Sequence, residues 1–169
     1  MIKLALISIC ILFLVITCIS LFIPSHVRIS KIVEMRTDSA TLWNNIDDLR
    51  QWEKWNPFFK DFGEKKVIYL DTSNGIWNAL KVESTPVLKK GIIDGDHIMQ
   101  MQNGQHSPVI SGWHCVVNPG SPGTVTVQWY MDFKLGWLPW HKFGSLLYEK
   151  KYGTLMEAGL MNLKYILEK

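Results

Sequence analysis

Cysteine is scarce in this chain of 169 residues, which has only three. Cys10 and Cys18 lie in an N-terminal apolar run, so Cys115 is the one cysteine in the rest of the chain. A disulfide needs two cysteines, and a disulfide framework within the body of the protein is therefore excluded. Cysteine usage does not decide whether the protein lies in an oxidising or a reducing compartment.

Charge of one sign is not concentrated anywhere in the sequence. Lysine and arginine number 18 against 15 acidic residues, which gives a net charge of +3. The neighbouring basic residues form isolated pairs, such as Lys65 and Lys66, and no longer block occurs. Nucleic-acid binding needs a clustered basic surface, so we expect no nucleic-acid partner.

Motifs for metal binding and catalysis are also lacking. The five histidines and Cys115 include no pair at a spacing such as C-x-x-C or H-x-x-x-H. His114 and Cys115 are adjacent in an expected strand, where neighbouring side chains point to opposite faces. No serine stands in a G-x-S-x-G context, and no phosphate-binding loop occurs. We therefore predict no metal and no cofactor, and the catalytic residues of any enzymatic activity stay unknown.

A long apolar run opens the chain. The stretch from Leu4 to Ile23 contains twenty residues without a charge. This length matches the hydrocarbon core of a bilayer, about 30 Å, and Pro24 then ends the helix. We interpret residues 1–25 as a single-pass transmembrane anchor and residues 26–169 as one domain.

Two questions about this segment stay open. A cleaved signal peptide is the alternative to an anchor, although the sequence ISLFIPSH does not supply a clean small-x-small site. The side of the membrane on which the domain lies is undecided, because Lys3 precedes the run and only Arg28, Lys31 and Arg36 follow it closely.

Two segments near the C-terminus organise the expected fold. From Thr124 to Leu135 apolar and polar residues alternate without a break, which predicts a long strand with one buried face. From Tyr148 to Leu167 apolar residues recur at helical spacing, which predicts an amphipathic helix. We expect this helix to cover the apolar face of a curved sheet.

The remaining strands follow from β-branched runs separated by turn residues. Residues from Val27 to Arg36 predict a first strand. Two short helices follow, one capped by Asp38 or Ser39 and one carrying Trp52 and Trp55. Further strands are expected at five segments separated by turns such as Asn74-Gly75 and Asp94-Gly95: Val67 to Leu70, Ile76 to Glu83, Val87 to Ile93, His97 to Gln102 and Val109 to Val117. The prediction is an α+β fold with about seven antiparallel strands.

The order of these elements resembles the START-like (SRPBCC) helix-grip superfamily. The resemblance is carried by the segment Trp52-x-x-Trp55-Asn56-Pro57 and by glycines 153 and 159 of the final helix. Within the superfamily the chain is most similar to polyketide cyclase/dehydrase-type proteins that carry an N-terminal membrane segment, and the similarity extends from about Val27 to the end. It implies a START/Bet v 1-like fold with an internal apolar cavity, which in many relatives holds a lipid, sterol, hormone or polyketide. It implies little about chemistry, because one fold hosts many functions.

Eight tryptophans exceed what a core of this size needs, which indicates a large apolar cavity wall or an interaction surface. We predict that the ligand is contacted by apolar side chains on the expected strands and by the final helix: Trp77, Met99, Met101, Trp113, Trp129, Met131, Leu155, Met156 and Gly159. Ordinary core packing is the alternative for each of these residues.

Three functions are compatible with the sequence. The favoured one is a membrane-anchored module that binds an apolar or amphiphilic, lipid-like small molecule between the sheet and the final helix. The second is an enzyme of the cyclase/aromatase or dehydratase type, for which no converging ionisable groups are visible. The third is an interaction domain that docks to a protein or to the membrane through the Trp-rich segment from Gly136 to Phe143. The ligand, the protein partner and the oligomeric state are not determined.

Overall fold

The computed structural model of the protein describes residues 2–62, 67–73, 76–82, 85–93, 96–101 and 109–169. Side chains of residues 60–62, 70–73, 76–78, 85–93 and 96–101 are outside the described part. The elements are α1 Ile2–Leu21, β1 His26–Arg36, α2 Ser39–Asp47, α3 Trp52–Trp55, the 3-10 helix η1 Pro57–Phe62, β2 Val67–Ser73, β3 Ile76–Val82, β4 Thr85–Ile93, β5 Asp96–Met101, β6 Val109–Val117, β7 Thr124–Lys134, α4 Pro139–Ser145, the π-helical turn η2 Glu149–Gly153 and α5 Thr154–Leu167.

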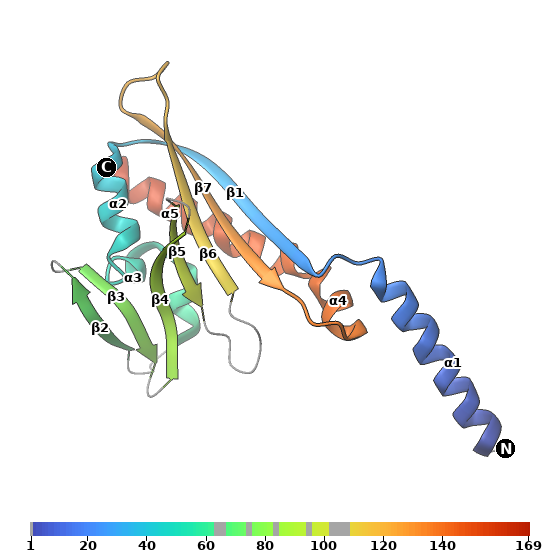
Figure 1. The fold of residues 1–169 in the computed structure, drawn as a ribbon. Helices are drawn as coiled ribbons and strands as arrows, with labels where there is room; N and C mark the ends of the chain where they lie inside the picture. The colour runs from blue at the N-terminus through green and yellow to red at the C-terminus, as the bar shows by residue number, and fades with distance from the viewer. Residues whose placement is uncertain (1, 63–66, 74–75, 83–84, 94–95, 102–108) are drawn as a thin grey trace.

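The seven strands form one antiparallel sheet in the order β1-β7-β6-β5-β4-β3-β2. Strands β2 to β7 follow one another as a meander, whereas β1 joins the sheet beside the last strand. The sheet is curved, and β2 and β3 lie at the end near α2 and α3 (Figure 1). The predicted α+β class, the strand number and the two short helices after the first strand are confirmed.

Strand β7 carries the inner face of the sheet, as its alternating sequence predicted. Val125, Val127, Trp129, Met131 and Phe133 are all buried. The same register runs through β1, where Ile29 is opposite Met131 and buried with it. Alternate side chains of an extended strand point to opposite faces, so the apolar positions of β1, β6 and β7 line one surface.

The short helices begin where the sequence supplies a cap. The Asp38 carboxylate accepts a hydrogen bond of 2.8 Å from the Thr41 backbone N–H and one of 2.6 Å from its hydroxyl group. Leu42 and Ile46 on the inner side of α2 are buried. Pro57 does not simply close α3: it begins η1, because its fixed φ suits the first position of a helical turn.

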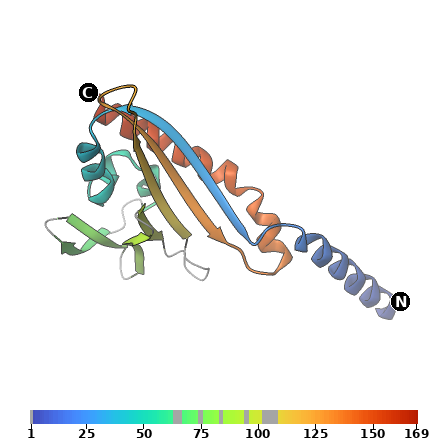
Figure 2. The same cartoon turned by 45° about the horizontal axis from the view of Figure 1, so that its top comes forward.

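The C-terminal helix covers the inner face along the β1 side of the sheet (Figure 2). Met156, Gly159, Leu160 and Leu163 form its buried stripe. Its end is fixed to the end of β1, since the Lys164 ammonium donates to the Glu34 carbonyl over 2.9 Å. The predicted helix from Tyr148 is continuous with α5, but its first turn is the wider π-helical η2.

Helix α1 extends away from the sheet and its apolar side chains are exposed (Figure 1). Its 20 residues make it the one helix in the described chain that is long and apolar enough to cross a membrane. The Thr17 hydroxyl donates to the Phe13 carbonyl and the Ser20 hydroxyl to the Thr17 carbonyl. These two hydroxyl groups are therefore satisfied within the helix, as an apolar environment requires.

Replacement of Gly159 is expected to destabilise the fold. A Cβ at this position would lie 2.9 Å from Trp129 Cζ3 and 3.1 Å from Pro57 Cδ, so the helix or the indole must move. We expect Gly159→Ala to lower the free energy of unfolding by about 1–3 kcal/mol in urea titrations, despite its better helix propensity. Gly144→Ala is the matched control, because a Cβ there meets nothing within 4 Å. Equal stabilities of the two variants would contradict the close packing.

The Asp38 cap gives a pH-dependent contribution to stability. Hydrogen bonds from the Thr41 side chain and backbone hold the pKa of this carboxyl below its ordinary value of 3.8. The stabilisation is therefore complete above that value and is lost as the pH falls through the lower folded pKa. Asp38→Ser keeps a cap that does not titrate. We expect this variant to lose less thermal stability than the wild type between about pH 5 and pH 3, an interval that contains the ordinary pKa of a carboxyl group. Equal losses of stability in the wild type and Asp38→Ser as the pH falls would refute the pH-dependent role of the Asp38 carboxylate.

Candidate functional site

The inner face of the sheet brings together residues from distant strands. Trp113 of β6 is opposite Trp129 of β7, and Ser111 is opposite Met131. All four are buried, with exposed fractions of 1% or less. Among the described inner-face positions of β6 and β7, Ser111 is the one hydroxyl, and no carboxylate or imidazole is present. The candidate site is therefore an apolar surface with few polar groups.

Four tryptophans form the centre of this surface. Trp113 and Trp129 are stacked, with ring centroids 5.4 Å apart and an interplanar angle of 22°. Trp52 packs edge-on against Trp113 at 5.1 Å, and Trp55 packs edge-on against Trp129 at 5.8 Å. Such offset and edge-to-face pairs are favourable beyond their buried area. The tryptophans of α3 thus pack on the middle of the sheet, rather than at its edge.

The four indole N–H groups differ in how they are satisfied. Trp129 Nε1 donates to the Ser111 hydroxyl over 2.7 Å. Trp52 and Trp55 donate to backbone carbonyls of α2, over 2.8 and 3.3 Å. Trp113 Nε1 is buried and has no hydrogen-bond acceptor among the described residues. A buried donor without an acceptor is unfavourable, which makes this nitrogen the notable polar feature of the inner face.

The final helix approaches the tryptophans at its glycine. Gly159 faces Trp129 and Pro57, and Met156 is fully buried beside it. Phe58 of η1 lies 6.0 Å from Trp129 and 6.3 Å from Tyr152 between ring centroids. The space between β7 and α5 is thus filled by aromatic side chains.

The structure places the predicted ligand-contacting residues as follows. Trp113, Trp129, Met131, Met156 and Gly159 are buried in the space between sheet and helices, and Leu155 is half-buried on α5. Their contact with a ligand stays a prediction. The side chains of three others lie outside the described residues: Trp77, Met99 and Met101.

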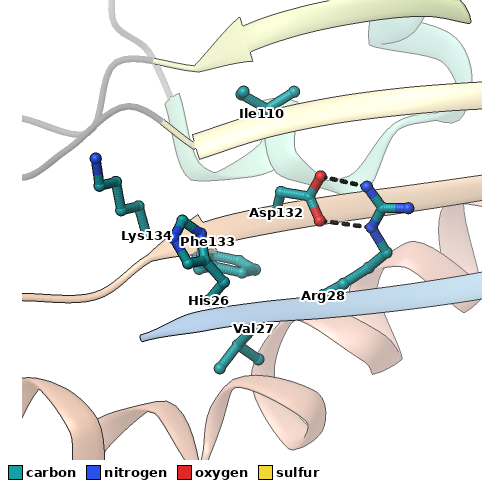
Figure 3. Close-up of a pocket in the computed structure, with 7 residues that line it drawn as sticks. All are labelled: His26, Val27, Arg28, Ile110, Asp132, Phe133 and Lys134. Atoms are coloured by element: carbon teal, nitrogen blue, oxygen red, sulfur yellow. Dashed lines mark hydrogen bonds and ion pairs between the residues drawn. The ribbon is translucent and has the colours of Figure 1, made fainter. Parts of the chain in front are cut away.

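A pocket of about 610 Å³ lies at the other end of the sheet, where β1 begins and β7 ends (Figure 3). Its polar lining comes from His26, Arg28, Asp132 and Lys134, mostly on the outer face. Asp132 lies between the buried Met131 and Phe133 in the alternation of β7, so its side chain is on the outer face. The Arg28 guanidinium donates to both of its carboxylate oxygens over 2.7 Å.

Tyr130 completes this outer cluster. The Arg28 guanidinium lies 4.5 Å from the centre of its ring, a cation–π distance. The ring in turn covers Gly112, where a Cβ would lie 2.2 Å from the Tyr130 ring. The pairing of Arg28 with Asp132 follows from the register of β1 and β7, which the alternating pattern alone did not define.

The titratable groups described elsewhere in the chain do not form a reactive set. Burial raises the pKa of the Cys115 thiol, which keeps it protonated and disfavours a nucleophilic role. Burial and the hydrogen bond to Glu53 raise the pKa of Tyr69, which joins β2 to α3. Among the described residues no three histidine, cysteine, aspartate or glutamate side chains are grouped as metal ligands.

Loss of the Ser111 hydroxyl is expected to destabilise the inner face. Ser111→Ala removes the acceptor of the buried Trp129 N–H, and we expect the free energy of unfolding to fall by about 1–3 kcal/mol. The exposed Ser121 lies in the turn before β7, and Ser121→Ala should change it by less than about 0.5 kcal/mol. Urea titration of both variants measures the difference. An unchanged free energy of unfolding in Ser111→Ala would mean that the hydrogen bond adds nothing to stability.

Comparison with known proteins gives structural similarity alone. No protein-family model matches this sequence, and a search of curated proteins finds no match either. Several solved structures cover most of the chain, including the following three. A START superfamily protein from Mycobacterium smegmatis has a TM-score of 0.58 at 18% identity, covering 83% of this chain and 97% of its own. Norcoclaurine synthase from Thalictrum flavum has 0.53 at 12%, covering 89% and 92%. The Zhui aromatase/cyclase from Streptomyces sp. R1128 has 0.53 at 10%, covering 82% and 93%.

At these identities the similarity establishes the architecture: a curved antiparallel sheet, two short helices after its first strand and a long C-terminal helix on its inner face. The chain has the START-like helix-grip fold.

Proposed function

We propose that the protein is a membrane-anchored binding module that holds an apolar or amphiphilic small molecule against the inner face of its sheet. The observation that carries the proposal is the Trp113 indole, which is buried while its N–H lacks an acceptor among the described residues. A ligand with an oxygen acceptor on an apolar body satisfies both the nitrogen and the surrounding aromatic surface. Fatty acids and related lipids have this chemistry.

The arrangement of the final helix supports the same proposal. Helix α5 packs mainly against β1, at one edge of the sheet, and the tryptophans of α3 pack on β6 and β7. Trp113 stands on β6, whose other neighbour is β5. A guest beside Trp113 would thus lie toward β5 and away from α5. The neighbours named as aromatase/cyclase and norcoclaurine synthase show that this fold accommodates proteins that act on small molecules.

The exposed apolar surface of α1 supports the anchoring part of the proposal. Its side chains face away from the sheet, and its 20 residues match the thickness of a bilayer core. Residues 1–25 would then form the anchor and residues 26–169 the binding domain. The enzymatic alternative has no comparable observation among the described residues, since the inner faces of β6 and β7 lack an acid–base pair.

Photolabelling of the full chain in lipid nanodiscs tests the binding role. The probes are a fatty acid that carries a diazirine and a diazirine-bearing alkane of equal length, and peptide mass spectrometry locates the adducts. We expect the fatty acid to label peptides of β6 and β5. Trp113→Phe should reduce this labelling by about 2- to 10-fold, which corresponds to the net free energy of one hydrogen bond. Labelling by the alkane should not change.

Trp129→Phe is the matched control, because it removes an indole donor that already has Ser111 as its acceptor. Its fatty-acid labelling should stay closer to that of the wild type. Adducts confined to α1 would overturn the binding role, and equal losses in both variants would remove Trp113 as the polar contact.

A further inference from the structure

An exposed apolar patch surrounds α4. Trp137, Trp140, Leu146 and Leu147 are 57–69% exposed, and Phe143 is 37% exposed. These five residues, here called the α4 patch, belong to one segment of eleven positions, 137–147. Scattered exposed apolar residues are ordinary on protein surfaces, whereas a contiguous group of this kind marks an interaction site.

The α4 patch is continuous with the end of α1. The Lys142 ammonium donates to the Ile23 carbonyl over 2.9 Å, and the side chain is only 4% exposed. Helices α1 and α4 are in contact, and both views place α4 beside the point where the chain leaves α1 (Figures 1 and 2). The patch is therefore attached to the C-terminal end of the apolar helix.

The position of this contact defines the depth of the patch. If α1 crosses a bilayer, its 20 residues span about 30 Å and Leu21 reaches the boundary of the hydrocarbon core. Ile23 is then at the level of the lipid headgroups, and Lys142 holds α4 at the same level. Tryptophan is the residue that favours this level, because its ring is apolar while its N–H is polar.

The charge of the segment around α4 is compatible with an anionic lipid surface. No aspartate or glutamate occurs from Lys134 to Tyr148. The basic residues of this segment that reach the surface are Lys134 and His141, whereas Lys142 is buried and bonded to Ile23. Lys134 lines the pocket at the end of β7, on the same side as the start of β1. Basic residues beside an apolar surface favour membranes that contain anionic lipids.

We propose that the α4 patch docks on the surface of the bilayer that α1 spans, with Trp137 and Trp140 among the lipid headgroups. The domain is then held against the membrane at two points and does not hang from a free linker. This inference rests on the proposed membrane anchoring. It adds a second contact, whose failure can be observed while the anchor still holds.

Lipid quenching of a fluorescent label on the full chain tests the docking. With the three native cysteines replaced by alanine, a nitrobenzoxadiazole label is attached through Leu146→Cys in the patch or through Met161→Cys on α5. Met161 is also exposed, at 54%, but belongs to α5, which runs away from α1 and α4 along the sheet (Figure 1). The protein is reconstituted into vesicles of phosphatidylcholine and phosphatidylglycerol that contain a doxyl-labelled lipid, and density flotation verifies its association.

We expect quenching at position 146 to exceed that at 161 by about twofold or more, as for a label in the headgroup layer. Trp137→Ala with Trp140→Ala should reduce the quenching at 146 by about half, because the two rings are the largest exposed side chains of the patch. The control replaces two exposed apolar residues of α5, Met161→Ala and Ile166→Ala, in the same Leu146→Cys background. This pair of substitutions should leave the quenching at position 146 unchanged.

The outcomes separate the two proposals. Protein that fails to float with the vesicles overturns the anchor and the docking together. Protein that floats but is quenched equally at 146 and 161 overturns the docking alone. Cross-linking of position 146 between two copies, without lipid quenching, would assign the patch to a second copy of the chain and also overturn the docking.

Discussion

The stack of Trp113 and Trp129 across β6 and β7 organises the packing of the sheet against the helices. Two elements pack directly on it: α3 places one indole against each ring, and α5 comes close only because Gly159 has no side chain to collide with Trp129. Large rigid rings leave few alternative arrangements at the packing density of a protein interior. The two short helices, the sheet and the final helix are thereby fixed around one aromatic centre.

Polar groups are rare in this aromatic centre. An indole N–H with an acceptor in the protein has a structural role, whereas one without an acceptor is a candidate for ligand binding. The Ser111 hydroxyl satisfies Trp129, and backbone carbonyls of α2 satisfy Trp52 and Trp55. The indoles of Trp52, Trp55 and Trp129 thus have acceptors within the protein, whereas Trp113 has none among the residues that the structure describes. This imbalance is the physical basis for the proposed amphiphilic ligand, since a purely apolar interior would need no donor at that place.

The end of the sheet near α1 has a different character. Here the Arg28 and Asp132 pair is exposed, the pocket is open, and the apolar residues around α4 face outward. The buried Lys142 connects this end to the last turn beyond α1. An apolar patch that would be unfavourable in water is favourable against lipid. The two proposals thus assign different ends of the molecule to different roles: the inner face of the sheet to a bound guest and the end near α1 to a membrane surface.

The elements and the fold class could be predicted from local sequence patterns: the alternation of β7, the helical period of α5, the Asp38 cap and the charge-free run of α1. Short-range sterics and hydrogen bonding turn such patterns into structure. Which residues meet across the fold could not be predicted in this way. Arg28 and Asp132 are 104 positions apart, and Lys142 and Ile23 are 119 apart. Such pairs depend on strand register and on the packing of helices over the sheet. A periodic pattern identifies the buried face of an element, but not the residue that the neighbouring element places against it.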